Sequence, residues 1–175
     1  MSATHLPFED LNMDQVGVVV RDVRAVAETL GRLFGIGPFR ILEWPIEGIN
    51  PESTYHGQPE EYRLLLGFAT IGRTQIELVQ PLAGRSIWRD FLETHGPGLH
   101  HVRFTVPDFE EMVAYLEGAG VEKIASGTGA HIGSEWAYFD TGGYLDGVMV
   151  ELRKRLEGPG GEGKWAGEGV QGAED

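Results

Sequence analysis

An internal duplication constrains the fold of this chain more than any other feature. The two copies begin at Gln15 and His101 and read QVGVVVRDVRAVAETLGRLFG and HVRFTVPDFEEMVAYLEGAG. Gln15 therefore corresponds to His101, and Asp22 corresponds to Asp108, because the members of each pair are 86 residues apart. A repeat of this kind predicts two copies of one supersecondary unit.

Each copy later contains an apolar strand that is interrupted by one carboxylate. These strands read TQIELVQPL around Glu77 and GVMVELRK around Glu151. The duplication thus places an amide, an imidazole and two carboxylates at equivalent strand positions. These side-chain types are good ligands for divalent cations, so the pattern indicates a metal site shared between the two halves.

Composition limits the classes of protein that this chain can belong to. Its 175 residues and 19.2 kDa suffice for one compact domain. A net charge of −13 argues against a nucleic-acid surface, and the absence of cysteine excludes disulfides and thiolate ligands. No apolar run approaches the roughly 18 residues of a membrane span, and the N-terminus lacks the layout of a secretory signal. We therefore expect a cytoplasmic protein with no nucleic-acid or membrane partner.

Both halves predict the same order of elements, which is one strand, one helix and three further strands. Helical spacing of apolar residues predicts helices over 23–34 and 109–119. Asp22 and Asp108 precede these helices and are expected to cap them, each contributing about 1 kcal/mol. The expected division is a first βαβββ module at 12–82, a linker helix at 83–98, a second βαβββ module at 99–155 and a disordered acidic, glycine-rich tail at 156–175.

Two loops are candidates for substrate specificity. Residues 46–61 are polar and rich in proline and glycine, and long loops of this kind often carry function. Residues 126–134 contain the glycine-rich segment GTGAHIG. His56 and His131 lie in these two loops and are expected to be surface residues.

Alternation along the strands predicts which side chains share one hollow. The first strand has an all-valine face that is expected to pack on a helix, so Gln15 points to the opposite side. His100 falls on the helix side or at the rim, which makes it a weaker ligand candidate than His101. A divalent cation would offset the cost of burying carboxylates together. The side chains expected in the hollow are Gln15, Glu77, His101, Arg103 and Glu151.

These patterns resemble the vicinal oxygen chelate superfamily of glyoxalases, bleomycin-resistance proteins and dioxygenases. The resemblance covers about residues 12–155, and SIWRDFLETHGPGLHHVRFTVPD and GVMVELRKR look most like methylmalonyl-CoA epimerase-like proteins. It implies an α+β fold in which two βαβββ modules form a cupped, barrel-like mixed sheet with the helices outside. It also implies a homodimer, and the sequence leaves open whether the modules pair within one chain or across that dimer.

The resemblance further implies a divalent metal, which would be Zn²⁺, Ni²⁺, Co²⁺, Mn²⁺ or Mg²⁺. The family's usual ligands are histidine, glutamine or glutamate, histidine and glutamate. Gln15 stands where the first histidine is expected, whereas Glu77, His101 and Glu151 match the remaining positions. This set is similar to that of one branch of glyoxalase I.

Proton transfer is the chemistry that the resemblance implies, in an epimerase, an isomerase or a glyoxalase-type lyase. The substrate would be a small acyl-CoA, a 2-oxo acid or a hemithioacetal, and the metal would act as a Lewis acid. Glu151 is the expected base, with Glu77 as the second catalytic carboxylate. Arg103 either holds an anionic group of the substrate or forms an ion pair with one of these glutamates.

The sequence leaves three functions open, namely an epimerase with a substitute second acid or base, a binding protein without catalysis and a dioxygenase. The stretch YRLLLGFA lacks the glutamate that the epimerases use as a second acid or base, and Glu43, Glu60 or Glu61 would replace it only if their loop covers the hollow. A bleomycin-resistance-like protein would bind a small molecule without catalysis. An extradiol-type dioxygenase would need two histidines and one carboxylate, and only His101 occupies a ligand position.

Overall fold

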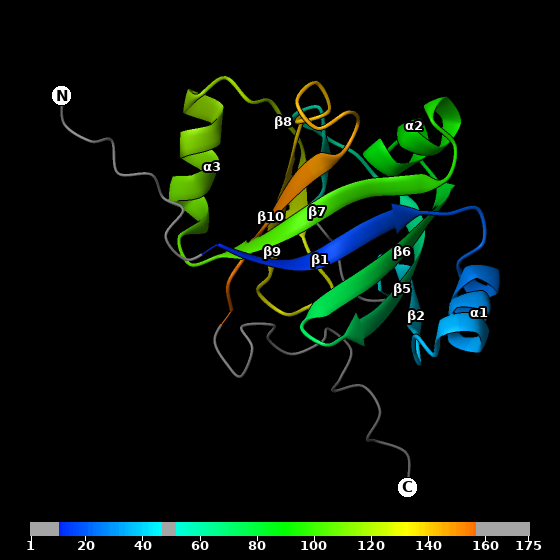
Figure 1. Ribbon diagram of the computed structural model, residues 1–175. Helices are drawn as coiled ribbons and strands as arrows, with labels where there is room; N and C mark the ends of the chain where they lie inside the picture. Colours follow the sequence, from blue (N-terminus) through cyan, green and yellow to red (C-terminus); the bar gives the residue numbers. More distant parts are fainter. Residues whose placement is uncertain (1–10, 47–51, 157–175) are drawn as a thin grey trace, which may run out of the picture.

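The computed structural model of the protein describes residues 11–46 and 52–156 (Figure 1). These residues form one mixed sheet of ten strands that curls around a hollow, in the order β2-β5-β6-β1-β7-β10-β9-β8-β3-β4. Helices α1 and α3 lie against the outer side of this sheet, whereas α2 packs its buried side chains against the inner side (Figure 1). The expected α+β class and cupped mixed sheet are therefore confirmed.

The elements follow one another along the chain in the order that the duplication predicts. The first half contains β1 (Asn12–Val19), α1 (Val23–Phe34), β2 (Arg40–Trp44), β5 (Arg63–Ile71) and β6 (Thr74–Ala83). Helix α2 (Ile87–Thr94) follows β6. The second half contains β7 (Gly98–Val106), α3 (Phe109–Gly118), β8 (Lys123–Thr128), β9 (Glu135–Phe139) and β10 (Met149–Lys154). Antiparallel pairing of β1 with β7 joins the halves within one chain.

Part of the segment expected as a long loop belongs to the sheet. Strands β3 (Thr54–Tyr55) and β4 (Gln58–Pro59) form a short hairpin, and β3 pairs with β8. The prediction of a loop over 46–61 was wrong for this hairpin, because two-residue strands leave no periodicity to detect. Residues 47–51 lie outside the described ranges, as do residues 157–175 of the expected tail.

Apolar side chains form three clusters that match the predicted faces of the strands. The cluster beneath α1 contains Val20, Val23, Ala27, Leu65 and Leu78. The cluster beneath α3 contains Val106, Phe109, Met112, Phe139 and Leu152. The third cluster lies inside the curled sheet and includes Val19, Trp44, Tyr62, Leu66, Phe68 and Trp88. Val19 and Val20 thus fall on opposite sides of the sheet, as strand alternation requires.

The helices begin where the sequence predicts. Asp22 accepts a hydrogen bond from the backbone N–H of Ala25 at 3.0 Å, and Asp108 accepts one from Glu111 at 3.1 Å, so both N-caps are confirmed. Gly35 ends α1 in the left-handed conformation with φ 68°, which favours glycine. None of the helices in the described part of the chain has both the length and the apolar composition needed to cross a membrane.

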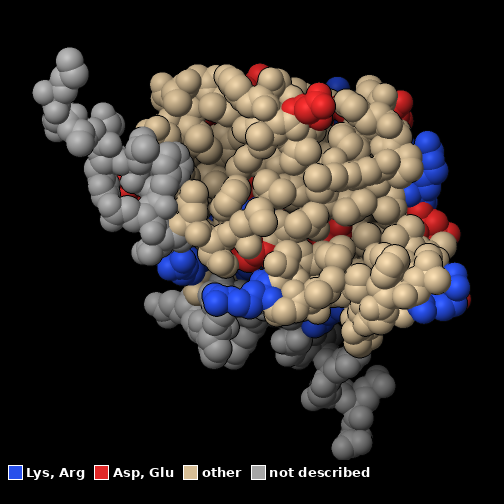
Figure 2. Space-filling model, in the orientation of Figure 1, with Lys and Arg blue, Asp and Glu red and all other residues tan. Residues whose placement is uncertain are grey.

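Charged side chains on the face shown in Figure 2 lie mostly toward its edges. The basic residues there are separated from one another, and acidic residues lie among them (Figure 2). Uncharged residues cover most of this face.

A bulge in β7 places a second histidine beside the first. His101 lies opposite Gly17 of β1, and the register then shifts so that His100 is the extra residue. His100 is fully buried, and its ring packs against that of Phe91 in α2 at a centroid distance of 5.1 Å. The expected helix side is the face that packs on α1 and α3, but the His100 ring lies among the side chains of the inner cluster. The expectation that His100 lies on that helix side or at the rim was wrong, because the bulge interrupts the alternation on which it depended.

Gly17 provides the space that the His101 ring occupies. A β-carbon on Gly17 would lie 1.8 Å from Cε1 of His101. We expect Gly17→Ala to displace the imidazole or the β1–β7 pairing and to lower the free energy of unfolding by about 1–3 kcal/mol. Urea unfolding curves would measure this loss.

Gly31→Ala is the matched control for this substitution. The nearest atom to a β-carbon on Gly31 would be the carbonyl oxygen of Ile36 at 3.5 Å, which is an ordinary contact. Because alanine is a better helix former than glycine, this variant should be more stable by about 0.5–1 kcal/mol. Similar unfolding curves for the two variants would contradict the proposed role of Gly17.

Candidate metal centre and its cavity

Four side chains from four neighbouring strands meet on the inner side of the sheet. Gln15 comes from β1, Glu77 from β6, His101 from β7 and Glu151 from β10. The strand order β6-β1-β7-β10 makes these strands adjacent at the centre of the sheet. The sequence-predicted set is thus brought together by the pairing of the first and last strands of each repeated unit.

The oxygens of this cluster converge on one ring nitrogen. His101 Nε2 lies 3.2 Å from Gln15 Oε1, 3.1 Å from Glu77 Oε2 and 3.3 Å from Glu151 Oε2. The exposed fractions are 1% for Gln15, 9% for Glu77, 0% for His101 and 6% for Glu151. A single N–H can serve only one of these oxygens well. The cluster therefore has more acceptor oxygens than its imidazole can satisfy.

The donor set fits a divalent cation. Ligands bound at about 2.0–2.2 Å and at right angles lie about 3 Å apart, which is close to the distances around His101 Nε2. Ligand atoms of Glu77, His101 and Glu151 all lie within 4.8 Å of one another. Carboxylate, amide and imidazole donors suit Zn²⁺, Mn²⁺ and similar ions. This cluster could therefore hold a divalent metal ion.

Tyr138 on β9 is a part of the site that the sequence did not indicate. Its hydroxyl donates a hydrogen bond to Glu151 Oε2 at 3.0 Å and lies 3.4 Å from His101 Nε2. Burial and the Glu151 carboxylate raise the pKa of Tyr138 well above its usual value, so the phenol stays protonated and can donate this hydrogen bond. Burial also raises the pKa of Glu151, while His101 and Arg103 act in the opposite direction.

Two further side chains orient the candidate ligands. Gln75 Oε1 accepts a hydrogen bond from Gln15 Nε2 at 2.6 Å, which turns Gln15 Oε1 toward His101. His100 Nδ1 lies 2.9 Å from His101 Nδ1. Burial and the neighbouring His101 lower the pKa of His100 well below its usual value, so its ring is neutral. Neither role could be read from the sequence, because one depends on strand register and the other on the β7 bulge.

Arg103 forms an ion pair that the sequence did not predict. Its Nε donates to Asp14 Oδ1 at 2.9 Å, and Asp14 also accepts from the hydroxyl of Thr105. The expected alternative of direct pairing with Glu77 or Glu151 was therefore wrong, although Arg103 lines the same cavity. Burial opposes the charge of Arg103, but Glu151 and Asp14 outweigh it and raise the pKa of the guanidinium.

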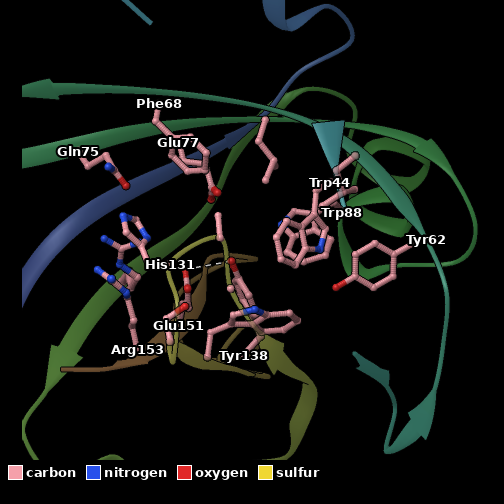
Figure 3. Close-up of a pocket in the computed structure, with 17 residues that line it drawn as sticks. Trp44, Tyr62, Phe68, Gln75, Glu77, Trp88, His131, Tyr138, Glu151 and Arg153 are labelled. Atoms are coloured by element: carbon pink, nitrogen blue, oxygen red, sulfur yellow. Dashed lines mark hydrogen bonds between the residues drawn. The ribbon is translucent and has the colours of Figure 1, made fainter. Parts of the chain in front are cut away.

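A cavity of about 80 Å³ opens beside the cluster, and its two ends differ in chemistry (Figure 3). One end carries Gln75, His131 and Arg153. The other end carries the aromatic side chains Trp44, Tyr62 and Trp88. Glu77, Glu151 and Tyr138 lie between the two ends (Figure 3).

His131 is half-buried and contributes to the cavity wall, which its loop-like sequence did not indicate. Burial lowers the pKa of His131 to about 4, and the charges of Arg153 and Arg103 act in the same direction. Its imidazole is therefore neutral near pH 7. His56, in contrast, is exposed as expected and lies 3.4 Å from Glu122. The sequence could not predict that only one of the two histidines lines the cavity, because both lie in loop-like segments without periodicity.

The carboxylates considered as a second acid or base, Glu43 on β2 and Glu60 and Glu61 after β4, do not line the cavity. Glu43 and Glu60 form ion pairs with Arg63 and Arg85, and Glu61 is exposed. Among the described residues, the carboxylates that line the cavity are Glu77 and Glu151. The wall contributed by β5 is apolar and consists of Leu64, Leu66 and Phe68.

Comparisons with known proteins agree with this architecture. The sequence profile described as the Glyoxalase/Bleomycin resistance protein/Dioxygenase superfamily matches residues 14–139. The uncharacterized protein YqjC of Bacillus subtilis is 30% identical over 93 residues, which are 53% of this chain and 66% of YqjC, slightly under two thirds of its length.

Two solved structures show the same fold. The hypothetical protein BH1468 of Bacillus halodurans has a TM-score of 0.64 at 22% identity, with 86% of this chain and 99% of that chain covered. Methylmalonyl-CoA epimerase of Mycobacterium tuberculosis has a TM-score of 0.62 at 22% identity, with 90% and 94% covered. At this level of identity the likeness concerns the fold alone.

Tyr138→Phe removes the hydroxyl that donates to the Glu151 carboxylate. Because a buried carboxylate then loses a hydrogen-bond donor, we expect the free energy of unfolding to fall by about 1–3 kcal/mol, measured in urea. Tyr62→Phe is the matched control, since its buried hydroxyl makes only a 3.3 Å contact with Ser53 Oγ. The control should lose less than about 1 kcal/mol. Equal losses would show that the Tyr138 hydroxyl has no special role.

Proposed function

Because the chain belongs to the Glyoxalase/Bleomycin resistance protein/Dioxygenase superfamily, we propose that it is a divalent-metal-dependent enzyme that transfers a proton on a small substrate. The substrate carries two adjacent oxygen atoms, which would complete the shell of the metal. The observation that carries this proposal is the convergence of three side-chain oxygens on His101 Nε2 at 3.1–3.3 Å. Such a cluster of buried carboxylates is costly unless a cation balances it.

Each residue of the cluster has a defined part in the proposed reaction. Gln15, Glu77, His101 and Glu151 would hold the cation. A bound divalent cation would supply Lewis-acid chemistry, polarising a substrate oxygen and making the neighbouring C–H more acidic. Glu151 would switch between the roles of ligand and base and would accept that proton, because it lines the cavity and receives a hydrogen bond from the Tyr138 hydroxyl. Glu77 is the second carboxylate beside the substrate.

The apolar β5 wall favours proton transfer at one face of the substrate. Epimerisation needs acid–base groups on opposite faces of the reacting carbon, and Leu64, Leu66 and Phe68 offer none. We therefore favour an isomerase or a glyoxalase-type lyase, in which Glu151 removes the proton and returns it from the same side. Loss of substrate epimerisation in a His131→Ala variant would instead support the epimerase alternative, since His131 also lines the cavity.

The cavity favours a small 2-oxo acid over a CoA thioester or a large hemithioacetal. Its volume of about 80 Å³ is far below the roughly 300–1,000 Å³ typical of pockets for drug-sized ligands. A CoA thioester could insert only its acyl end. Arg103 and Arg153 line the cavity and are suited to a carboxylate, whereas the aromatic end suits a short apolar substituent.

The remaining alternatives have less support from the site. A dioxygenase triad needs a second imidazole in the cluster, but His100 directs its Nδ1 at His101 Nδ1. A binding protein without catalysis needs no pair of buried carboxylates beside an imidazole. The cluster of candidate metal ligands therefore favours an enzyme over a binding protein without catalysis.

Metal analysis tests the cluster directly. Wild-type protein should retain about one divalent cation per chain after dialysis. Glu151→Ala should lose most of it, because a charged ligand is removed. Glu43→Ala is the control, since Glu43 is exposed and pairs with Arg63 at the surface, and it should retain the wild-type amount. Full retention of metal by Glu151→Ala would count heavily against the site.

Hydrogen exchange tests the proposed reaction. In deuterated water, nuclear magnetic resonance should show metal-dependent exchange of the proton on C3 of a small 2-oxo acid, the carbon next to the ketone. Glu151→Gln should slow this exchange by about 100-fold or more, because the base is lost. Glu43→Gln should leave the rate unchanged. If 2-oxo acids, CoA thioesters and methylglyoxal–thiol adducts all fail to exchange with metal present, the binding-protein alternative gains support.

A further inference from the structure

The buried histidine pair is a feature that the proposed reaction leaves unexplained. His100 and His101 are both fully buried, and their Nδ1 atoms are 2.9 Å apart. At this distance only one of the two nitrogens can carry a hydrogen. If both did, the hydrogens would clash, and if neither did, two lone pairs would face each other. The tautomers of the two rings are therefore linked.

A cation held by His101 would select one of the two arrangements. A cation needs the lone pair of His101 Nε2, which faces Gln15, Glu77 and Glu151. The proton of His101 must then lie on Nδ1, where His100 Nδ1 accepts it. The proton of His100 lies in turn on its own Nε2, and both rings are neutral.

Surrounding aromatic rings hold His100 in the position that this hydrogen bond needs. Its centroid lies 5.1 Å from that of Phe91 with the rings nearly perpendicular, 6.2 Å from Trp88 and 6.0 Å from Tyr138. The β7 bulge brings the ring to this side of the sheet. His100 therefore cannot turn away without displacing the core around α2.

We propose that His100 is a positioning residue, whose Nδ1 fixes the metal-binding tautomer and orientation of His101. This inference rests on the proposed metal site. It assigns a function to a residue that touches neither the cation nor the cavity. Groups that accept a hydrogen bond from a metal-binding histidine typically change metal affinity by about 10–100-fold when they are removed.

Two substitutions separate an acceptor role from a packing role. In His100→Asn the amide oxygen can take the place of Nδ1 as acceptor, so zinc affinity should remain within about 3-fold of wild type. In His100→Leu no acceptor remains, and affinity measured by competition with a chelator should fall by about 10–100-fold. The visible absorption of bound Co²⁺ should change in His100→Leu and be restored in His100→Asn.

Several outcomes would overturn the inference. Wild-type zinc affinity in His100→Leu would show that the acceptor is unnecessary. Equal weakening in both variants would indicate that only the packing of the ring matters. The control is the free energy of unfolding of both variants after a chelator has removed the metal. If His100 acts only on metal binding, metal-free His100→Leu should be as stable as metal-free His100→Asn. Failure of the wild type to bind zinc or cobalt would overturn the proposed function on which this inference rests.

A measurement without substitutions gives an independent answer. Nitrogen-15 resonances of the zinc-loaded wild type report which ring nitrogen carries hydrogen. We expect a protonated Nδ1 on His101 and a protonated Nε2 on His100. The reverse assignment for His100 would overturn the inference, even if both variants fail to fold.

Discussion

Two buried carboxylates beside one imidazole are the constraint on which the rest of this structure depends. Glu77 and Glu151 both lie close to His101 Nε2, in a place where water reaches little of either side chain. Charges of like sign in such surroundings raise the free energy of the folded state unless a partner offsets them. Tyr138, the buried imidazole and the Arg103 guanidinium provide part of this compensation. A divalent cation in the cluster would add to it.

The duplication explains how such a cluster can form from distant parts of the chain. In each repeated unit the first and last strands lie side by side, and the two units join through β1 and β7. The four strands that carry the candidate ligands are thereby consecutive at the centre of the sheet. The cluster also requires the absence of a side chain at Gly17, because the His101 ring passes over that position. Glycine on β1 is thus part of the site without contributing a ligand.

The surroundings of the cluster distinguish this protein from what its fold alone implies. A fold of this kind carries enzymes and binding proteins alike, so function must be argued from the site. Here the β5 wall is apolar, the cavity is small, and Arg103 is held by Asp14. The apolar wall and the small cavity are the features on which we base the proposal of one-sided proton transfer on a small substrate.

Much of the fold and the identity of the cluster were determined by the sequence alone. The repeat predicted the paired units, Asp22 and Asp108 predicted the helix starts, and alternation placed Gln15 and His101 in one hollow. These features depend on short-range periodicity and capping, which neighbouring residues encode.

Tertiary structure alone decided the side of the sheet on which His100 lies, the partner of Arg103 and the place of His131 in the cavity wall. A bulge changes the face of one residue without leaving a mark in the local pattern. The contact between Asp14 and Arg103 depends on the register of two strands far apart in the chain. The path of a loop back across the sheet follows from the packing of the whole domain, and for that reason its residues could not be assigned from the sequence.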